Sequence, residues 1–196
     1  MIYMFKKITS GRNAVIVAGI IYTVIAIITV VSAWIIDLHR FDFWLSISRY
    51  VALRPWTAVL YFLCAVIMAL LVIRYLRNTY MPKYRKVIYL LIIICVCGCA
   101  IFPCNRDWSR TVASIHNYFA YGLMLVGFFS FLTLLFLESD KRLKRFGIIA
   151  TSYAAFFIFA YAIVRWIAFW KTMLIWENIF IYLFLVELWL EGGRKT

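Results

Sequence analysis

The run AVIVAGIIYTVIAIITVVSAWII, residues 14–36, decides the structural class of this protein. It contains no charged side chain, and it exceeds the ~20 residues that an α-helix needs to cross the hydrocarbon core of a bilayer. Its apolar residues are continuous and do not alternate with a period of two, as they would in a strand of a membrane barrel. The run therefore predicts a transmembrane helix.

Five further apolar runs follow the first one. Hydrophobic residues make up 66% of the 196 positions, which is too many for a soluble domain whose surface faces water. Short charged segments separate the runs, and this pattern indicates repeated crossing of a membrane. The predicted spans are residues 14–36, 56–73, 87–102, 112–137, 146–164 and 173–190. We expect residues 1–196 to form a single all-α domain, a polytopic transmembrane helical bundle of six spans.

The basic residues indicate how this bundle is oriented. Of the 21 Lys and Arg residues, fourteen fall on the side of the predicted spans that carries both termini, and seven fall on the other side. Because basic residues concentrate in cytoplasmic loops, both termini are predicted to be cytoplasmic. The formal net charge of +13 does not indicate a nucleic-acid-binding protein, because the charges lie in short loops and form no broad basic face.

The longest connection between predicted spans, residues 37–55, is expected on the outer side. Polar and aromatic side chains alternate along it, at Phe41, Phe43, Trp44, Ile47 and Tyr50. This pattern is typical of a short helix that lies in the interface between lipid and water. Residues 37–55 are therefore predicted to be an outer interfacial loop.

Both histidines and half of the acidic residues gather at the predicted outer end. Asp37 and His39 follow the first span, and Asp107 precedes the fourth. His116 and Glu177 lie about one turn inside the fourth and sixth spans. An ionisable side chain inside a span costs several kcal/mol unless it is paired or hydrated, so we expect His116 and Glu177 to face the bundle interior.

Two interpretations of these polar groups are open. In the first, they form a pocket in which His116, Asp107 and Glu177 are candidate catalytic residues. The candidate ligand-binding residues of that pocket are Arg165, Asn117, Arg49, His39 and Asp37. In the second, a hydrogen bond from His116 or Asn117 to Glu177 or Asn178 holds the fourth and sixth spans together. No metal site is predicted, because no two of the His, Asp and Glu side chains at this end have the spacing of a metal motif.

Four cysteines cluster near the end of the third span. Cys95, Cys97, Cys99 and Cys104 do not have the C-x-x-C spacing of a redox site. Inside a span, cysteine behaves as a small apolar residue. The first three are therefore interpreted as packing residues.

Three short patches resemble a known family. Residues 98–107 with 116–120 resemble the G-x-F-P-x-D…H-x-x-x-A signature of a bacterial six-span membrane family of unknown function, the domain of unknown function 998 type. Residues 47–52 with Pro55 resemble its I-S-D-L-G-A element, although Arg49 replaces the acidic residue, and extra residues separate Pro103 from Asp107. Residues 176–178 resemble an acidic-aromatic element of the last span. This family is similar to FRAG/DRAM/Sfk-type membrane proteins, and the resemblance implies a lipid-facing role in the bacterial plasma membrane.

The expected function is to bind or reorganise a lipid or other amphiphile at the outer leaflet, through the polar outer end. One alternative is a membrane-embedded hydrolase that uses His116 with the outer acids, with or without a metal. Another is a non-catalytic partner subunit. The expected partner is membrane lipid, with a membrane-protein partner or a second copy of the chain also open, and the sequence identifies no cofactor.

The orientation of the bundle can be tested by reporter fusions. A reporter fused at Asp140, in the connection between the fourth and fifth spans, should lie in the cytoplasm. A reporter fused at Arg106 should lie on the outer side. Finding both reporters on one side would contradict the six-span topology.

Overall fold

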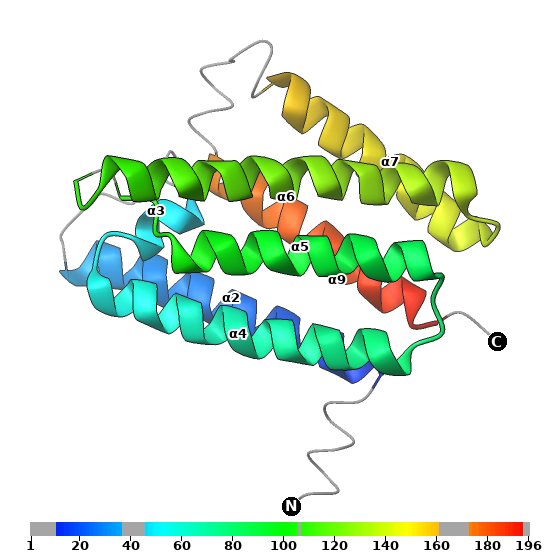
Figure 1. Ribbon diagram of the computed structural model, residues 1–196, viewed down its shortest axis with the longest axis horizontal. Coiled ribbons are helices and arrows are strands. Elements are labelled where there is room, and N and C mark those ends of the chain that lie inside the picture. Colours follow the sequence, from blue (N-terminus) through cyan, green and yellow to red (C-terminus); the bar gives the residue numbers. More distant parts are fainter. Residues whose placement is uncertain (1–10, 37–45, 106, 161–172, 194–196) are drawn as a thin grey trace, which may run out of the picture.

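The computed structural model describes residues 11–36, 46–105, 107–160 and 173–193. These residues form seven helices, and the six long ones alternate in direction, with the last two inclined to the other four (Figure 1). The helices are α2 (Arg12–Ile36), α3 (Ile47–Val51), α4 (Pro55–Asn78), α5 (Lys83–Ile101), α6 (Arg110–Leu137), α7 (Lys141–Ile158) and α9 (Met173–Glu191). The start of α2 and the end of α9 meet at one end of the bundle, where Arg12 Nε donates to the carbonyl of Trp189 over 3.2 Å.

Four of these helices, α2, α4, α5 and α6, are long and apolar enough to cross a membrane. Large apolar side chains lie on their surfaces, as at Ile35, Leu70 and Leu137, which are 64%, 62% and 65% exposed. Such exposure is unfavourable in water but not against lipid tails. The chain therefore has the properties of a multi-pass membrane protein. α7 and α9, which carry charged side chains within their length, are not among these four helices.

The six long helices occupy the six predicted apolar runs, and most of them extend into the charged segments beside the runs. α4 continues through Arg74 and Arg77, and α7 begins at Lys141, at the basic segment before its apolar run. Long basic side chains can reach water from a helix end while their stems cover apolar surface.

Asp140 caps the first turn of α7. Its side chain accepts a hydrogen bond of 2.8 Å from the backbone N–H of Arg142, and this bond lowers the pKa of the Asp140 carboxyl group.

α3 lies within the predicted outer interfacial loop, of which the structure describes residues 46–55. Ile47, Tyr50 and Val51 are 2–4% exposed and contact Ala33 of α2 and Leu174 of α9. These apolar side chains therefore face the bundle interior and not a lipid interface. α3 covers one end of the bundle, between α2, α4 and α9.

Arg85 lies at the opposite end of the bundle and is 1% exposed. Although the topology prediction counts it among the loop charges, it lies inside α5 and reaches two buried carboxylates of α9. Its Nη2 forms a hydrogen bond with Glu187, and its Nε donates to Glu191 Oε1 over 3.0 Å. Both glutamates are 0% exposed. These ion pairs connect α5 to α9.

Hydroxyl and carbonyl groups satisfy the remaining donors of the Arg85 guanidinium. Nη1 donates to the Ser130 carbonyl over 2.9 Å and to Thr133 Oγ1 over 2.7 Å, while Nη2 donates to Tyr89 Oη over 2.9 Å. Ser130 Oγ in turn donates to Glu187 Oε1 over 3.0 Å. The guanidinium thereby joins α5, α6 and α9 in one buried polar network, as a charge in a low-dielectric interior requires.

An aromatic cluster continues the contact between α6 and α9 towards the middle of the bundle. The ring of Phe131 stacks on that of Phe184 with centroids 5.1 Å apart, and Phe180 meets Phe184 edge to face at 5.0 Å. Gly127 of α6 lies directly against the Phe184 ring, where a Cβ atom would collide with it. The absence of a side chain at Gly127 therefore leaves room for the Phe184 ring against α6.

We predict that Arg85→Leu destabilises the protein by about 3–5 kcal/mol, because the two buried glutamates lose their guanidinium partner. The measurement is the thermal unfolding midpoint in detergent. Glu187→Gln keeps a hydrogen-bonding group beside Ser130 and should cost less.

The matched control is Lys83→Leu, which removes an exposed basic residue from the same helix. Equal unfolding midpoints for the Arg85→Leu and Lys83→Leu proteins would contradict a stabilising role for the network.

Candidate functional site

A cavity of about 500 Å³ lies between the helices towards the α3 end of the bundle. All seven described helices contribute to its lining. Its volume is within the range of about 300–1,000 Å³ that is usual for small-molecule sites. The cavity is therefore large enough to hold a ligand.

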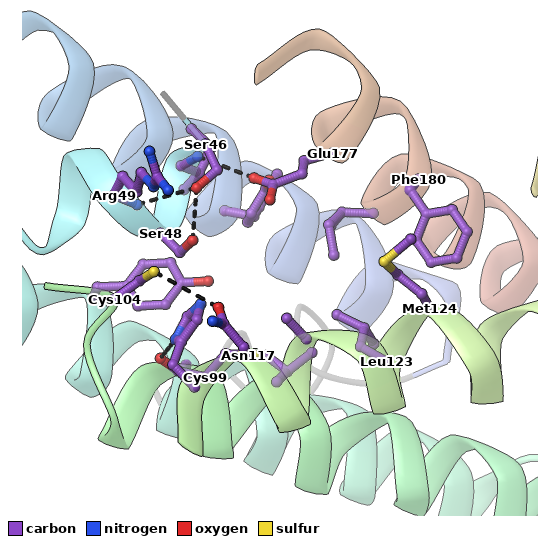
Figure 2. Close-up of a pocket in the computed structure, with 18 of the residues that line it drawn as sticks. Ser46, Ser48, Arg49, Cys99, Cys104, Asn117, Leu123, Met124, Glu177 and Phe180 are labelled. Carbon is purple, nitrogen blue, oxygen red and sulfur yellow. Dashed lines mark hydrogen bonds between the residues drawn. The ribbon is translucent and has the colours of Figure 1, made fainter. Parts of the chain in front are cut away.

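The lining changes from polar to apolar along the cavity, as Figure 2 shows. The polar end carries Ser46, Ser48, Arg49, His116, Asn117 and Glu177. The apolar part is formed by Met68, Val96, Leu123, Met124, Phe180 and Ile181. In the figure, Leu123, Met124 and Phe180 lie well away from Arg49 and the two serines. The cavity is thus amphipathic along its length.

Glu177 approaches the polar end from α9 and holds α3 in place. Its Oε2 accepts a hydrogen bond of 3.1 Å from the backbone N–H of Ile47, at the first turn of α3 (Figure 2). Ser46 Oγ accepts from the N–H of Arg49 over 3.3 Å and so caps the same turn. A carboxylate is favourable at a helix N-terminus, where backbone N–H groups lack helical partners. Glu177 therefore fixes the position from which α3 presents Ser48 and Arg49 to the cavity.

His116 of α6 binds backbone groups at the end of α5. It is 3% exposed, and its Nδ1 lies 2.7 Å from the carbonyl oxygen of Phe102 and 3.1 Å from that of Cys99. Both partners are acceptors, so Nδ1 must carry the proton. In the neutral ring, Nε2 is then the nitrogen that can accept a hydrogen bond. His116 satisfies carbonyl groups that the end of α5 would otherwise leave unpaired.

His116 and Glu177 line the same cavity, but they are not partners of one another. Their hydrogen bonds go to the backbones of α5 and α3, respectively, and none joins the two side chains. Asn178 bonds instead to Tyr22 Oη over 2.9 Å, and Asn117 Oδ1 lies 4.0 Å from Cys104 Sγ. The predicted hydrogen bond between the fourth and sixth spans therefore does not form between these side chains.

Arg49 is the basic side chain of the cavity lining, and it is exposed on α3. It faces the cavity beside Ser46 and Ser48, whose hydroxyl oxygens are 2.8 Å apart. A guanidinium group with neighbouring hydroxyls can bind an anionic group by charge-assisted hydrogen bonds.

Of the remaining predicted site residues, the structure describes only Asp107. Asp107 is exposed in the connection between α5 and α6 and is not part of the cavity lining. Asn105, in the same connection, donates to the Ala52 carbonyl over 2.8 Å and accepts from the N–H of Asp107 over 2.9 Å. Asp37, His39 and Arg165 lie outside the described residues. The structure thus brings together His116, Asn117, Arg49 and Glu177, but not Asp107.

The cysteines lie in two different environments, which their spacing in the sequence does not distinguish. Cys99 and Cys104 line the cavity together with Cys64 of α4, whereas Cys95 packs beside Gly122 of α6. All five are free thiols. Within the described ranges, no three His, Cys, Asp or Glu side chains come together as metal ligands.

Three tyrosines of the cavity lining, Tyr22, Tyr61 and Tyr121, were missing from the predicted site. Tyr22 of α2 and Tyr61 of α4 both line the cavity, Tyr22 from within the run that predicts the first span. A tyrosine in the middle of an aliphatic transmembrane segment is the signal that could have identified Tyr22, because its hydroxyl group needs a partner away from lipid.

We predict that Glu177→Leu and His116→Ala each destabilise the protein by about 1–3 kcal/mol, because each leaves backbone groups without a partner. Glu177→Gln keeps an acceptor for the Ile47 N–H and should cost less. The two residues share no partner, so the losses in the double variant should add. A double variant no less stable than either single one, measured by thermal unfolding in detergent, would show direct pairing instead.

The chain matches no protein-family model, no curated protein and no solved structure.

Proposed function

We propose that this protein binds or reorganises a lipid or other amphiphile at the outer leaflet of a bacterial plasma membrane. The observation that carries the proposal is the amphipathic lining of the 500 Å³ cavity. A ligand that is apolar throughout would cover Arg49 and Asn117 without offering them a hydrogen bond, and a ligand that is polar throughout would leave the apolar walls around Phe180 without apolar contacts. An amphiphile satisfies both parts of the cavity.

The polar end favours a headgroup with a phosphate or carboxylate group. Arg49 supplies the positive charge and paired N–H donors for such a group. Ser48 and Asn117 supply neutral hydrogen-bonding groups beside it. The carboxylate of Glu177, beside Ser46 at the same end, is complementary to a positively charged part of a headgroup.

The proposal includes six transmembrane spans, with α7 and α9 as the fifth and sixth. Both helices have 18–19 residues, about 27–29 Å at the helical rise, which is close to the hydrocarbon thickness of ~30 Å. The four basic residues of α7 lie in its first two turns, where they can reach water. Two of the three acids of α9 are paired with Arg85 inside the bundle. With the basic ends of the helices in the cytoplasm, the cavity's polar end lies towards the outer leaflet.

The resemblance to the bacterial six-span family stays a prediction, and the cavity supports the proposal without it. The hydrolase alternative has less support, because Asp107 lies outside the cavity lining and His116 Nδ1 is committed to backbone carbonyls.

We predict that Arg49→Gln weakens amphiphile binding by about 1.5–3 kcal/mol, which is roughly tenfold or more in affinity. Binding of a single-chain alkyl phosphate can be followed by native mass spectrometry of the purified protein. Arg110→Gln is the matched control, since Arg110 is exposed at the start of α6 and does not line the cavity.

We also predict that Met124→Trp displaces the alkyl phosphate by filling the apolar part of the cavity. Leu125→Trp places the same side chain at the adjacent position, where Leu125 is 54% exposed, and should leave binding unchanged. If the cavity variants and the two controls bind the amphiphile equally well, the proposed site is wrong.

A further inference from the structure

A second, smaller cavity of about 70 Å³ lies deeper in the bundle, between α4, α5 and α9. Its lining is apolar apart from one hydroxyl group, that of Tyr89. Ile92, Phe184 and Leu188 form its walls. Dry, apolar space of this kind accepts hydrocarbon and not water.

The two cavities adjoin one another. Ala65 and Met68 of α4, Val96 of α5 and Ile181 of α9 line both of them. These four apolar side chains, which we call the junction, separate the apolar part of the first cavity from the second. An apolar route therefore runs from the polar end of the first cavity, through the junction, to Leu188.

The length of this route can be measured along α9. Glu177 marks its polar end and Leu188 its inner end, and these residues are eleven positions apart. At the helical rise of about 1.5 Å per residue, the route is roughly 16 Å long. The hydrocarbon core of a bilayer is about 30 Å thick and contains two layers of chains, so the chains of one leaflet extend over about 15 Å. The route thus has the length of one membrane-lipid chain.

The inner end of the route is closed by the Arg85 network. Tyr89 lines the second cavity, and its hydroxyl oxygen accepts a hydrogen bond of 2.9 Å from Arg85 Nη2. Beyond Tyr89, the space between the helices is occupied by the paired charges of Arg85, Glu187 and Glu191. A hydrocarbon chain would make no favourable contact with these charges. The polar network therefore sets a limit on how far a chain can enter.

We infer that the ligand of this protein carries a long acyl chain, which passes the junction and places its terminal methyl group in the second cavity beside Tyr89, Phe184 and Leu188. This inference rests on the proposed function and adds the class of ligand, a long-chain membrane lipid rather than a short amphiphile. The bundle takes up the chain in an extended form between α4, α5 and α9, and the headgroup stays at Arg49.

The inference can be tested with two photoreactive long-chain alkyl phosphates in vesicles that contain the full-length protein. One probe carries its diazirine beside the phosphate, and the other carries it at the end of the chain. Mass spectrometry of the crosslinked peptides should place the first probe near Ser48 and Asn117. The chain-end probe should label α9 around Phe184 and Leu188.

Variants at the junction separate the inference from the proposed function. The two junction variants, Ala69→Leu and Val72→Phe, fill the space just beyond the junction at residues that line the second cavity and not the first, so each should lower chain-end labelling of Leu188 several-fold while labelling by the phosphate-end probe persists. Ala155→Leu, on the exposed face of α7, should change neither. Two junction variants are used because either one alone could disturb folding, which thermal unfolding would detect.

Two outcomes would overturn the inference. If the chain-end probe labels lipid-facing residues such as Leu63 and Ile94, or if labelling of Leu188 is unchanged in both folded junction variants, the chain does not enter the second cavity. In that case labelling by the phosphate-end probe leaves the proposed function standing. If the phosphate-end probe fails to label the first cavity, both the inference and the proposed function are wrong.

Discussion

A guanidinium group inside a helical bundle must be paired, and the pairing of Arg85 determines how this protein is assembled. Its five N–H donors reach α5, α6 and α9, including two glutamates with no exposed surface. Removing water from these charges costs several kcal/mol per ion. The stable arrangement of α5, α6 and α9 is therefore the one in which all of these hydrogen bonds form together. One end of the bundle is thereby closed, and α5, α6 and α9 are fixed relative to one another from that end.

The other end is held by weaker and more distributed contacts, and this difference makes room for a cavity. His116 binds the last carbonyl groups of α5, and Glu177 binds the first N–H group of α3. Each side chain satisfies backbone groups that helix ends leave unpaired, and each also lines the cavity. The two residues therefore have a structural role that positions Arg49 and the serines, in addition to whatever contact they make with a ligand. The two adjoining cavities extend from this polar end towards the Arg85 network.

The helices were predictable because hydropathy follows from composition along the chain, and an observed helix lies in each of the six apolar runs. The placement of His116 and Glu177 near the starts of α6 and α9 was predictable for the same reason. Their partners were not, because the rotation of each helix about its axis depends on packing that a single apolar run does not specify. α3 shows the same limit, since its alternating pattern indicated an interfacial helix while its apolar face packs inwards. Arg85 was counted as a loop charge because it lies next to Lys83 and Lys86. The signal that it is buried is the pair Glu187 and Glu191, which are four residues apart and share one face of an apolar helix.

The most direct test of amphiphile binding in these cavities is an experimental density map of the protein purified in native membrane lipid. The account predicts elongated density between α4, α5 and α9, with its broad end beside Arg49, His116 and Glu177 and its narrow end near Leu188. A map that shows the cavity closed by its own side chains, or filled only with ordered water, would contradict it.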